Sequence, residues 1–500
     1  MKPILIIPLM GKRRKNIFNK NNFFFNKTYN FLLNHIFNNF KFCSKIILIC
    51  KKKDQKFIKF NKGPKINFIN LKNSNNQIDT ILRVKDIINQ NVPILILNPD
   101  ALFNFIQNKV ELNKHLLKCD LAFFGIKDYI NNSKDFKKDT FEVYGNNISS
   151  IMIKSGVSDN KKHFTSAGLY FFKNIKFFNK LNSKFIKKND SKRIDIQLAH
   201  LFKNSLRNKK VKYFLVKNFI DFGNQKKYEE YIFWKRFFKD EFFKFDKHKG
   251  SKILNIIPAA GEGKRHKELG YNKPKPLIPI SGKSMFENSI NRLPNRNKNL
   301  FIFKKKTFFK FKIKNIFSQN KTLQNYFLIN RKTKGMAETI LLAKDKLPRH
   351  QPAIISSCDI SFIINYKKFY KLLKKKPDGI IFTWRQYPFA DESPNSHAYV
   401  KVKKERVTSI SEKKTISKNP NNDYAVTGIF YFKSIKLLIE CIEHMMKNKI
   451  TVNNEYYVAT SMDKIIKDKK KIYNFEVDQF ISWSLPEHLK SYNYWEEIFK

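Results

Sequence analysis

Short apolar runs alternate along the whole chain with longer segments of mixed polarity. Runs of five or six residues, such as ILIIP (4–8), KIILIC (45–50), AIISS (353–357) and GIIFT (379–383), are apolar and β-branched over most of their length, with polar residues only at their ends. Residues 432–447 (FKSIKLLIECIEHMMK) instead repeat their apolar positions at helical spacing. Continuously apolar strands are buried on both faces, and the helices between them supply the cover. The pattern therefore predicts an α/β fold with mostly parallel, Rossmann-like sheets flanked by helices.

The chain contains this pattern twice, in the same order. Five blocks of the first half are matched in the second, among them KPILIIPLMGKRRK by SKILNIIPAAGEGKR and SAGLYFFKNIKFF by VTGIFYFKSIKLL. Matched positions, each with its offset, are Pro8 and Pro258 (250), Asp100 and Asp359 (259), Gly168 and Gly428 (260), and Trp234 and Trp495 (261). Ordered repeats of this kind indicate a duplicated structural unit. We predict tandem domains over 1–240 and 250–500, with the boundary in a helix end and charged linker near 236–252.

The chain is strongly basic, with a net charge of +58 from 99 Lys and Arg against 41 Asp and Glu. Such a charge would suit binding to nucleic acid or to an anionic membrane surface. However, Lys, Asn, Ile and Phe are abundant in loops and apolar runs alike, as an AT-rich coding sequence would produce, and the cations form no nucleic-acid-binding motif. We therefore do not expect nucleic acid as a partner. A hydrophobic share of 42% with 50 Phe suffices for two buried cores.

Neither a secretory signal nor a membrane span is expected. The opening apolar run precedes the basic cluster, and no small-residue cleavage site follows it, unlike in a signal peptide. No stretch reaches the roughly 18 apolar residues of a transmembrane helix. The five Cys residues are scattered without a CxxC pair, which argues against a disulfide framework and against a zinc site. These features predict a cytoplasmic protein with buried, reduced thiols.

A glycine-rich turn follows the first strand of the second repeat. It has the sequence AAGEGKR and includes Ala260, Gly261, Gly263 and Arg265. Small residues allow backbone N–H groups to approach phosphate closely, and Arg265 adds a forked cation for the same oxygens. Taken alone, the turn also fits a tight structural connection.

A proline-rich segment with two lysines comes next. In residues 272–283 (NKPKPLIPISGK), Lys273 directly precedes Pro274 and Lys275 stands between Pro274 and Pro276; prolines fix φ and so restrict where a side chain points. Together, IIPAAGEGKR and KPKPLIPISGKSMFE resemble the opening motif of the sugar-phosphate nucleotidyltransferase family, the enzymes that make nucleoside diphosphate sugars. The resemblance implies two tandem Rossmann-like nucleotidyltransferase domains, because each repeat has about the length of the family's catalytic domain.

The resemblance also implies roles in binding the nucleotide. Ala260, Gly261, Gly263 and Arg265 would hold the triphosphate, and Lys275 would stabilise the charge that develops at the α-phosphate. Lys273 lies close enough to compete with Lys275 for this assignment.

Two further segments correspond to the family's metal site and base site. Asp359, at the carboxyl end of the run AIISSCD, stands where the family has a Mg²⁺-binding aspartate, with Cys358 in place of the usual glycine. Mg²⁺ on a triphosphate needs hard oxygen ligands and few protein contacts. Gly335 and Glu338 occupy the place of a base-contacting turn, although the capped start of a helix explains these two residues equally well.

The acceptor side is implied by the later motifs of the second repeat. Glu412 and Lys413 resemble the family's pair that contacts sugar hydroxyls and the sugar phosphate, and Gly428 would let the sugar approach the backbone. Glu455, in NNEYYVATS, fits a substrate contact and a structural role equally.

The second repeat departs from the family at its last motif. Ser484 and Leu485 replace a glycine and a threonine, and no second metal-binding aspartate precedes them. A second metal ligand is therefore not assigned.

The first repeat lacks key parts of this pattern. No KPxxP segment follows its first strand, and Ile153 replaces Glu412, which removes electrostatic stabilisation of a transition state. We interpret it as a degenerate domain that serves in dimerisation, regulation or ligand sensing. The retained residues are Pro8, Gly11, Arg13, Arg14, Asp100, Lys154, Asp195 and Asp221.

The sequence hypothesis is a Mg²⁺-dependent transfer of a nucleotidyl group from a nucleoside triphosphate to a sugar phosphate or a similar phosphorylated acceptor. The product would supply surface polysaccharide synthesis. A homo-oligomer is compatible with the sequence, and neither the base nor the acceptor can be read from it. Two alternatives stay open: a regulatory or scaffold protein without catalysis, and a nucleotide-sugar glycosyltransferase, which usually carries two acidic residues spaced by one where SSCDIS offers only Asp359.

Overall fold

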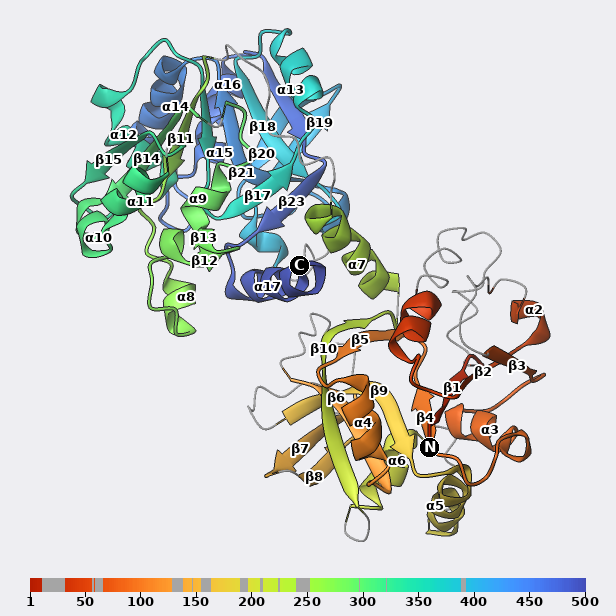
Figure 1. The fold of residues 1–500 in the computed structure, drawn as a ribbon. Coiled ribbons are helices and arrows are strands. Elements are labelled where there is room, and N and C mark those ends of the chain that lie inside the picture. Colours follow the sequence, from red (N-terminus) through yellow and green to blue (C-terminus); the bar gives the residue numbers. More distant parts are fainter. Residues whose placement is uncertain are drawn as a thin grey trace. The chain divides into compact units, whose positions relative to one another are not determined.

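The computed structural model divides the chain into two compact units, Met1–Tyr231 and Ile232–Lys500 (Figure 1). The structure describes the chain except for residues 11–31, 56–57, 59–65, 128–137, 146, 154–162, 189–196, 207–209, 224, 240–251, 296, 321 and 388–392. Each unit is a mixed α/β structure built on one large sheet. Across the described residues, no helix combines the length and the apolar character needed to cross a membrane.

The first unit is organised around a sheet in which parallel and antiparallel pairs are mixed. Its strand order is β3 (Ile66–Asn70), β2 (Lys45–Cys50), β1 (Ile4–Pro8), β4 (Ile94–Leu97), β9 (His163–Phe172), β6 (Leu121–Ile126), β10 (Val211–Asp221) and β5 (Ala101–Phe105). In addition, β7 (Thr140–Tyr144) pairs with β9, and β8 (Asn147–Met152) pairs with β7. The pairs on either side of β9 are antiparallel, whereas those among β1, β2, β3 and β4 are parallel. The labelled helices of this part are α2 (Lys52–Gln55), α3 (Gln77–Leu82), α4 (Lys109–Leu116), α5 (Ile175–Lys188), α6 (Leu198–Lys203) and α7 (Gln225–Phe238), and residues 32–39 are helical as well.

The second unit repeats this arrangement with nine strands. Their order is β15 (Asn325–Ile329), β14 (Asn299–Lys304), β11 (Leu254–Pro258), β16 (Ala353–Ser356), β21 (Tyr424–Phe432), β18 (Gly379–Trp384), β22 (Ile472–Glu476), β20 (Arg406–Ser411) and β19 (Tyr399–Lys403). Two short ladders stand apart, β12 (Pro279–Ile280) with β13 (Lys283–Ser284), and β17 (Ile360–Ile363) with β23 (Gln479–Ser482). The helices are α8 (Lys264–Glu268), α9 (Met285–Ser289), α10 (Lys305–Lys310), α11 (Ile313–Gln319), α12 (Met336–Leu341), α13 (Tyr366–Leu373), α14 (Ile435–Lys447), α15 (Val458–Ser461), α16 (Asp463–Lys467) and α17 (Pro486–Phe499).

The first seven strands of both sheets follow the same order. β3-β2-β1-β4-β9-β6-β10 in the first unit corresponds to β15-β14-β11-β16-β21-β18-β22 in the second. The registers agree as well, since Ile94 pairs with Phe172 where Ala353 pairs with Phe432. One difference is that the long strand β10 pairs with both β6 and β5, whereas its counterpart is split into β22 and β23. The shared topology supports the predicted duplication, which stays a prediction.

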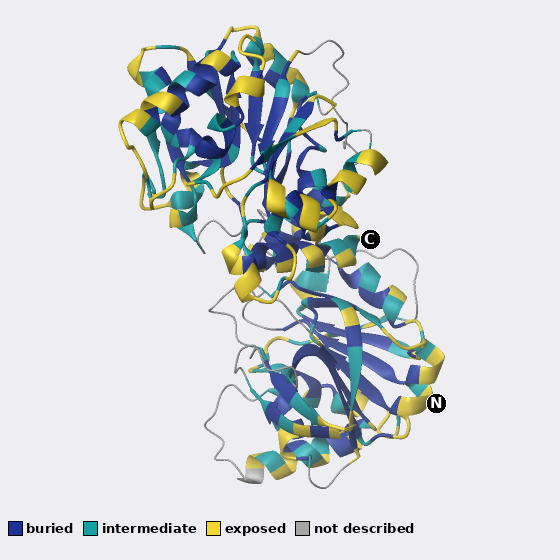
Figure 2. Ribbon diagram, turned by 90° about the vertical axis from the view of Figure 1, so that its left-hand side faces the viewer, coloured by how far each residue is buried: buried dark blue, intermediate teal, exposed yellow. Residues whose placement is uncertain are grey.

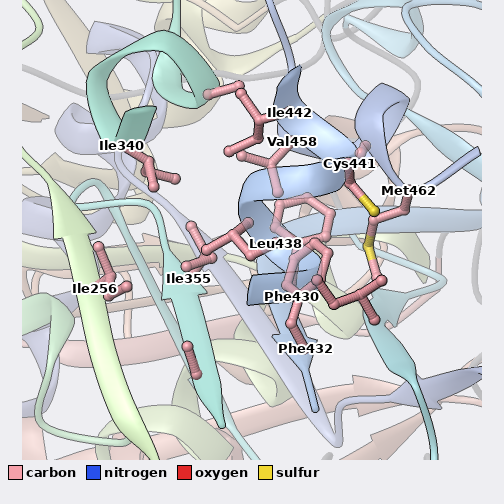
Figure 3. Close-up of a cluster of buried hydrophobic side chains, with 14 of the residues drawn as sticks. Ile256, Ile340, Ile355, Phe430, Phe432, Leu438, Cys441, Ile442, Val458 and Met462 are labelled. Carbon is pink, nitrogen blue, oxygen red and sulfur yellow. The ribbon is translucent and has the colours of Figure 1, made fainter. Parts of the chain in front are cut away.

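The core of the second unit lies between its sheet and the helices α12, α14, α15 and α16. The apolar face of α14 packs there, because its sequence places Leu438, Cys441 and Ile442 on one side of the helix. Figure 3 shows these side chains against strands β11, β16 and β21; the labelled residues are Ile256, Ile340, Ile355, Phe430, Phe432, Leu438, Cys441, Ile442, Val458 and Met462. Buried strands and half-exposed helices recur in both units (Figure 2). The continuous apolar runs are thus the buried strands that the sequence predicted.

The boundary between the units falls within a helix. Contacts divide the chain between Tyr231 and Ile232, yet α7 continues to Phe238. Trp234 is fully buried and packs in the second unit against Tyr492 of α17, with ring centroids 5.9 Å apart. The division therefore lies earlier than the predicted boundary near 236–252, of which residues 240–251 lie outside the described part of the chain. The assignment of domains to 1–240 and 250–500 stays a prediction.

Candidate active site

A cavity of about 820 Å³ opens in the second unit beside the carboxyl ends of β11 and β16. Ligands of open α/β sheets bind at this edge because loops from several strands converge there. Eleven of the twelve predicted site residues line it: Ala260, Gly261, Gly263, Arg265, Lys275, Gly335, Asp359, Glu412, Lys413, Gly428 and Glu455. Motifs spread over 196 positions of the sequence, from 260 to 455, are thus brought to one place.

The glycine-rich turn comes directly after β11 and leads into α8. Gly263 has a φ of 66°, and a Cβ at this position would lie 2.6 Å from the Cβ of Lys275. Only glycine fits such a conformation at so close an approach. A Cβ on Gly261 would meet nothing within 4 Å, since this residue faces open space. The turn therefore packs against the proline-rich segment on one side and lines the cavity on the other.

Lys275 and Asp359 form an ion pair inside the cavity. Lys275 begins a single 3-10 turn, Lys275–Leu277, which the extended residue Pro274 precedes. Asp359 follows β16 and also accepts a hydrogen bond from the hydroxyl of Ser357. Lys273 is exposed and does not line the cavity, so the structure brings Lys275, and not its neighbour, to the predicted position.

The Asp359 carboxylate is held in its charged form. Burial alone would raise its pKa, but the charge of Lys275 and the hydrogen bonds from Lys275 and Ser357 outweigh burial and hold the pKa below its ordinary value. The adjacent Cys358 thiol is buried, and burial raises its pKa to about 12. The carboxylate beside Lys275 is therefore ionised, whereas the neighbouring thiol is neutral and does not line the cavity.

Glu412 and Lys413 lie at the other end of the cavity, directly after β20. Lys413 donates a hydrogen bond from Nζ to the carbonyl of Ser396, and its Nζ lies 5.3 Å from the ring centre of Tyr457. Burial lowers the pKa of Lys413, and burial raises the pKa of Glu412 to about 7. The Oε2 atom of Glu412 is buried without a hydrogen-bond partner. An unsatisfied buried oxygen in a cavity wall is suited to a hydroxyl donor from a bound molecule.

Gly428 and Glu455 complete this end of the cavity. Gly428 has a φ of 90°, and a Cβ there would lie 3.3 Å from the Cβ of Ser357. The Tyr457 hydroxyl donates to Oε2 of Glu455 at 2.5 Å. Glu455 thus lines the cavity while it also anchors a neighbouring aromatic ring, so the structure keeps both roles that the sequence left open.

Gly335 and Glu338 are placed differently from each other. Gly335 lines the cavity at the start of α12, with a φ of 107° and a hypothetical Cβ only 2.6 Å from the carbonyl oxygen of Tyr456. Glu338 is buried and does not line the cavity. Its carboxylate pairs with Arg331 at 2.6 Å and accepts a hydrogen bond from the backbone N–H of Lys334. Glu338 therefore stabilises the turn before α12, which is the structural alternative that the sequence left open.

The oxygen donors around Asp359 fit a magnesium ion that is held mainly by substrate. Among the described residues, no group of three or more His, Cys, Asp or Glu side chains could hold a metal alone. Mg²⁺ usually keeps several waters and binds through one or two carboxylates plus substrate phosphates. Asp359 and the hydroxyl of Ser357 supply that kind of donor, and Ser482 stands in the cavity wall nearby.

Several cavity residues were not predicted from the sequence. Lys304 ends β14 and pairs with Glu262 of the glycine-rich turn. His397 lies at the cavity wall, where burial, together with the charge of Lys413, lowers its pKa to about 3 and keeps the ring neutral. A polar residue at the carboxyl end of a strand was the signal that could have identified Lys304. His397 stands in a loop before β19 and carries no such signal.

In the first unit, the described residues at the equivalent strand ends bond to one another. Asn98 N donates to Gly168 O as Ser357 N does to Gly428 O, and Phe222 N donates to Asp100 O as Trp483 N does to Asp359 O. These pairs make Asp100 the structural counterpart of Asp359. The predicted Gly11, Arg13, Arg14, Lys154 and Asp195 lie outside the described residues.

The second half of the chain matches a protein family, and a curated protein resembles part of the chain. Residues 254–498 match the family model described as nucleotidyl transferase. The Bifunctional protein GlmU of Methanocaldococcus jannaschii is 26% identical over 215 residues, which are 43% of this chain and 47% of that protein. This chain thus spans about half the length of that curated relative.

Two solved structures also resemble the chain. The nucleoside-diphosphate-sugar pyrophosphorylase of Vibrio cholerae has 19% identity and a TM-score of 0.40, over 48% of this chain and 99% of that chain. The inositol-1-phosphate CTP transferase of T. maritima has 15% identity and a TM-score of 0.37, over 50% and 98%.

The matched range extends from the first strand of the second sheet to the last helix, and so includes every predicted residue that lines the cavity. The family that the sequence motifs predicted is thereby confirmed. Residues 254–498, which make up almost all of the second unit, thus match the nucleotidyl transferase family.

Proposed function

We propose that the second unit transfers a nucleotidyl group from a nucleoside triphosphate to a sugar phosphate, or a similar phosphorylated acceptor, and releases pyrophosphate. The observation that carries the proposal is the joint position of Arg265, Lys275 and Asp359 in one cavity at the carboxyl ends of the strands. A fixed cation and a fixed carboxylate, in contact before substrate binds, are suited to a phosphate chain and its counterion.

In the proposed reaction, an oxygen of the acceptor phosphate attacks the α-phosphorus of the triphosphate. A new phosphorus–oxygen bond forms as the bond between the α-phosphorus and the bridging oxygen breaks, and both electrons of that bond leave with pyrophosphate. Phosphoryl-type transfer needs positioning and charge stabilisation more than covalent participation by the protein. Lys275 would donate to the α-phosphate oxygens as negative charge builds up there. Arg265 would hold the phosphates that leave.

Mg²⁺, when bound, would neutralise part of the negative charge of the phosphates. Asp359 would hold it from the protein side, with Ser357 orienting the carboxylate through its hydroxyl. This arrangement requires Lys275 to exchange its contact with Asp359 for a contact with phosphate. Because Lys275 lines the cavity beside Asp359, this exchange would require movement of only the flexible end of its side chain.

The acceptor would bind at the end of the cavity that holds Glu412 and Lys413. Lys413 is partly buried and offers a cation for the acceptor phosphate, and Glu412 Oε2 offers an unpaired acceptor for a hydroxyl. Gly428 leaves its backbone accessible between these groups and Asp359. A polyhydroxylated phosphate ester satisfies all three features, which supports a sugar phosphate. Supply of precursors for surface polysaccharide synthesis is the use we propose for the product.

The test is Mg²⁺-dependent pyrophosphate release from CTP, UTP, GTP, ATP and dTTP, each against a panel of sugar phosphates and polyol phosphates. Lys275→Ala and Asp359→Ala should abolish release, and Lys273→Ala is the matched control because its side chain is exposed outside the cavity. Pyrophosphate release from one pair of substrates by the natural chain and by Lys273→Ala, but not by Lys275→Ala or Asp359→Ala, would establish the reaction and identify the substrates. No release from any pair, in folded protein free of bound product, would contradict the proposal and favour a binding or scaffold role.

A further inference from the structure

We propose that the end of helix α7, which precedes the matched family range, is a positioning element of the second unit's site. Residues 232–238 of α7 belong to this unit by their contacts, although the family match begins only at residue 254. Their aromatic side chains brace two segments, one that leads to Asp359 and one that leads to Lys275. The effect on catalysis rests on the proposed function, whereas the effect on the two segments does not.

The first branch runs through the β17–β23 ladder. The side chain of Gln479, buried at the start of β23, donates to the carbonyl oxygen of Phe233 at 2.7 Å. Ser482 of the same strand pairs with Ile360, the residue directly after Asp359, and Trp483 N donates to Asp359 O at 2.8 Å. A hydrogen bond from α7 therefore fixes the strand that holds the backbone of Asp359.

The same branch has an aromatic component. The ring of Phe233 contacts Tyr387, with centroids 5.6 Å apart, and Tyr387 contacts Phe480 at 5.6 Å. Phe480 stacks on Trp384 with an interplanar angle of 3° and lines the cavity itself. Edge-on and stacked rings at these separations are favourable contacts. The cavity wall at Phe480 is thus supported from behind by α7.

The second branch runs through Tyr492 of α17. Three rings of α7 surround this tyrosine, those of Trp234, Phe237 and Phe238, at centroid distances of 5.9, 6.0 and 5.2 Å. The Tyr492 hydroxyl lies 2.9 Å from the hydroxyl of Ser281. Ser281 forms the turn of the β12–β13 hairpin, which follows the segment of Lys275. Tyr492 therefore holds that hairpin, and α7 holds Tyr492.

The two branches meet at the Lys275–Asp359 ion pair. A catalytic pair must keep its geometry to within fractions of an ångström, and supporting residues provide that precision. Helix α7 extends from Gln225 to Phe238, so its supporting residues lie within the predicted first repeat, 1–240. The structure gives that repeat a role in the second unit that needs no ligand site of its own.

The first test is hydrogen exchange on the full-length chain. In Trp234→Ala, exchange should become severalfold faster in three segments, 275–284, 357–364 and 477–485, and remain slow in β14 and β15. Arg236→Ala is the matched control, because this residue lies on the same helix but is exposed. Unchanged exchange in the three segments, or an equal rise throughout the unit, would overturn the proposal.

A milder variant guards against loss of folding. Gln479→Met removes the hydrogen bond to Phe233 at nearly constant side-chain volume, so only the first branch should loosen. Hydrogen exchange should become faster in 357–364 and 477–485 and should stay unchanged in 275–284. Exchange equal to that of the natural chain would contradict a role for this bond.

Activity supplies an independent readout. Once a substrate pair is known, Trp234→Ala should lower kcat about tenfold with less than a twofold change in either KM, and Trp234→Phe should restore most of it. Equal loss in Trp234→Phe, or a loss confined to KM, would contradict positioning. If the natural chain shows no turnover, the proposed function fails, while the exchange results still decide the structural role of α7.

Discussion

The two units share a sheet topology but differ in what joins the ends of their strands. In the second unit, Ser357 and the first residue of α12, Met336, both line the open cavity. At the matching positions of the first unit, Asn98 and the first residue of α3, Gln77, are joined by a hydrogen bond of 2.7 Å. The space that would receive a ligand between them is bridged by protein.

A second bridge spans the same edge of the first unit. Ser166 N donates to Asp139 O where Val426 N donates to Ala398 O, which makes Lys138 the counterpart of His397. Asp221, paired with Ala101, is the counterpart of Ser482, paired with Ile360. Lys138 and Asp221 form an ion pair at 3.2 Å, whereas His397 and Ser482 both line the cavity. Among the described residues, a shared fold thus carries strand-end side chains that line an open cavity in one unit and bond to one another in the other.

The largest expected difference concerns the two matching aspartates. Asp359→Asn removes the carboxylate that we propose for Mg²⁺, so turnover should fall on the order of a hundredfold to a thousandfold. Asp100→Asn should leave turnover within a factor of two, because its unit lacks the lysine segment. Pyrophosphate release at saturating substrate measures both. An equal loss in the two variants would mean that the first unit takes part in the chemistry.

Replacing the matching glycines should destabilise both units but should lower turnover in only one of the two variants. Gly428→Ala and Gly168→Ala each place a Cβ at positive φ, 3.3 Å from Ser357 Cβ and 2.9 Å from Asn98 Cβ respectively. Each should lower the free energy of unfolding of its own unit by about 1–3 kcal/mol. Only Gly428→Ala should also lower turnover, since Ser357 orients Asp359. Denaturant unfolding, with exchange to assign the unit, and turnover check this; loss of turnover in Gly168→Ala would count against it.

Glu412 should give the second unit a pH dependence that the first unit lacks, since Ile153 stands at the matching place. Its pKa is raised from 4.5 to about 7 in the fold, so the unfolded chain ionises it first. Stability is therefore lost as pH rises from about 4.5 to about 7, by up to about 3 kcal/mol. The difference in free energy of unfolding between Glu412→Gln and the natural chain should grow over this range and then level off. A constant difference from pH 4.5 to 8 would refute the raised pKa.

The smallest effect is expected from a substitution that gives the second unit a carboxylate which the first unit has at the matching position. Ser482→Asp places an aspartate where the first unit has Asp221, opposite the residue that follows Asp359. A second oxygen ligand should lower the Mg²⁺ concentration for half-maximal turnover by a few fold. A Mg²⁺ titration measures it, with Ser482→Asn as the uncharged control. No shift, or the same shift in both variants, would show that this position does not reach the metal.

Much of the site could be predicted because its residues sit in long motifs at strand ends. Gly263 and Lys275 are only 12 positions apart in the sequence, and Pro274 and Pro276 on either side of Lys275 restrict its backbone, so the local pattern favours their contact. Asp359 ends a continuous apolar run, which fixes its place at the edge of a parallel sheet. The repeated strand order followed from the repeated pattern for the same reason.

Other features depend on contacts between distant segments, which a local pattern does not encode. Glu338 has the same sequence surroundings whether it faces a nucleotide or Arg331, and only the fold decides between them. His397 becomes a neutral cavity residue because Lys413 and buried rings surround it. The role of Trp234 depends on Tyr492, more than two hundred positions later.

That separation has a consequence for how the chain is made. On a ribosome that adds about 5–20 residues per second, Trp234, Phe237 and Phe238 emerge on the order of ten to fifty seconds before Tyr492. Until then, the apolar end of α7 has no partner to cover it, because the rings that enclose it belong to a helix not yet synthesised. The first unit can complete its own sheet early, but the aromatic side chains at the end of α7 stay exposed until α17 is synthesised. Exposed apolar surface of this kind is bound by chaperones and promotes aggregation. Slower translation of the second half should therefore lower the yield of folded protein, and Phe237 and Phe238 are where that vulnerability is concentrated.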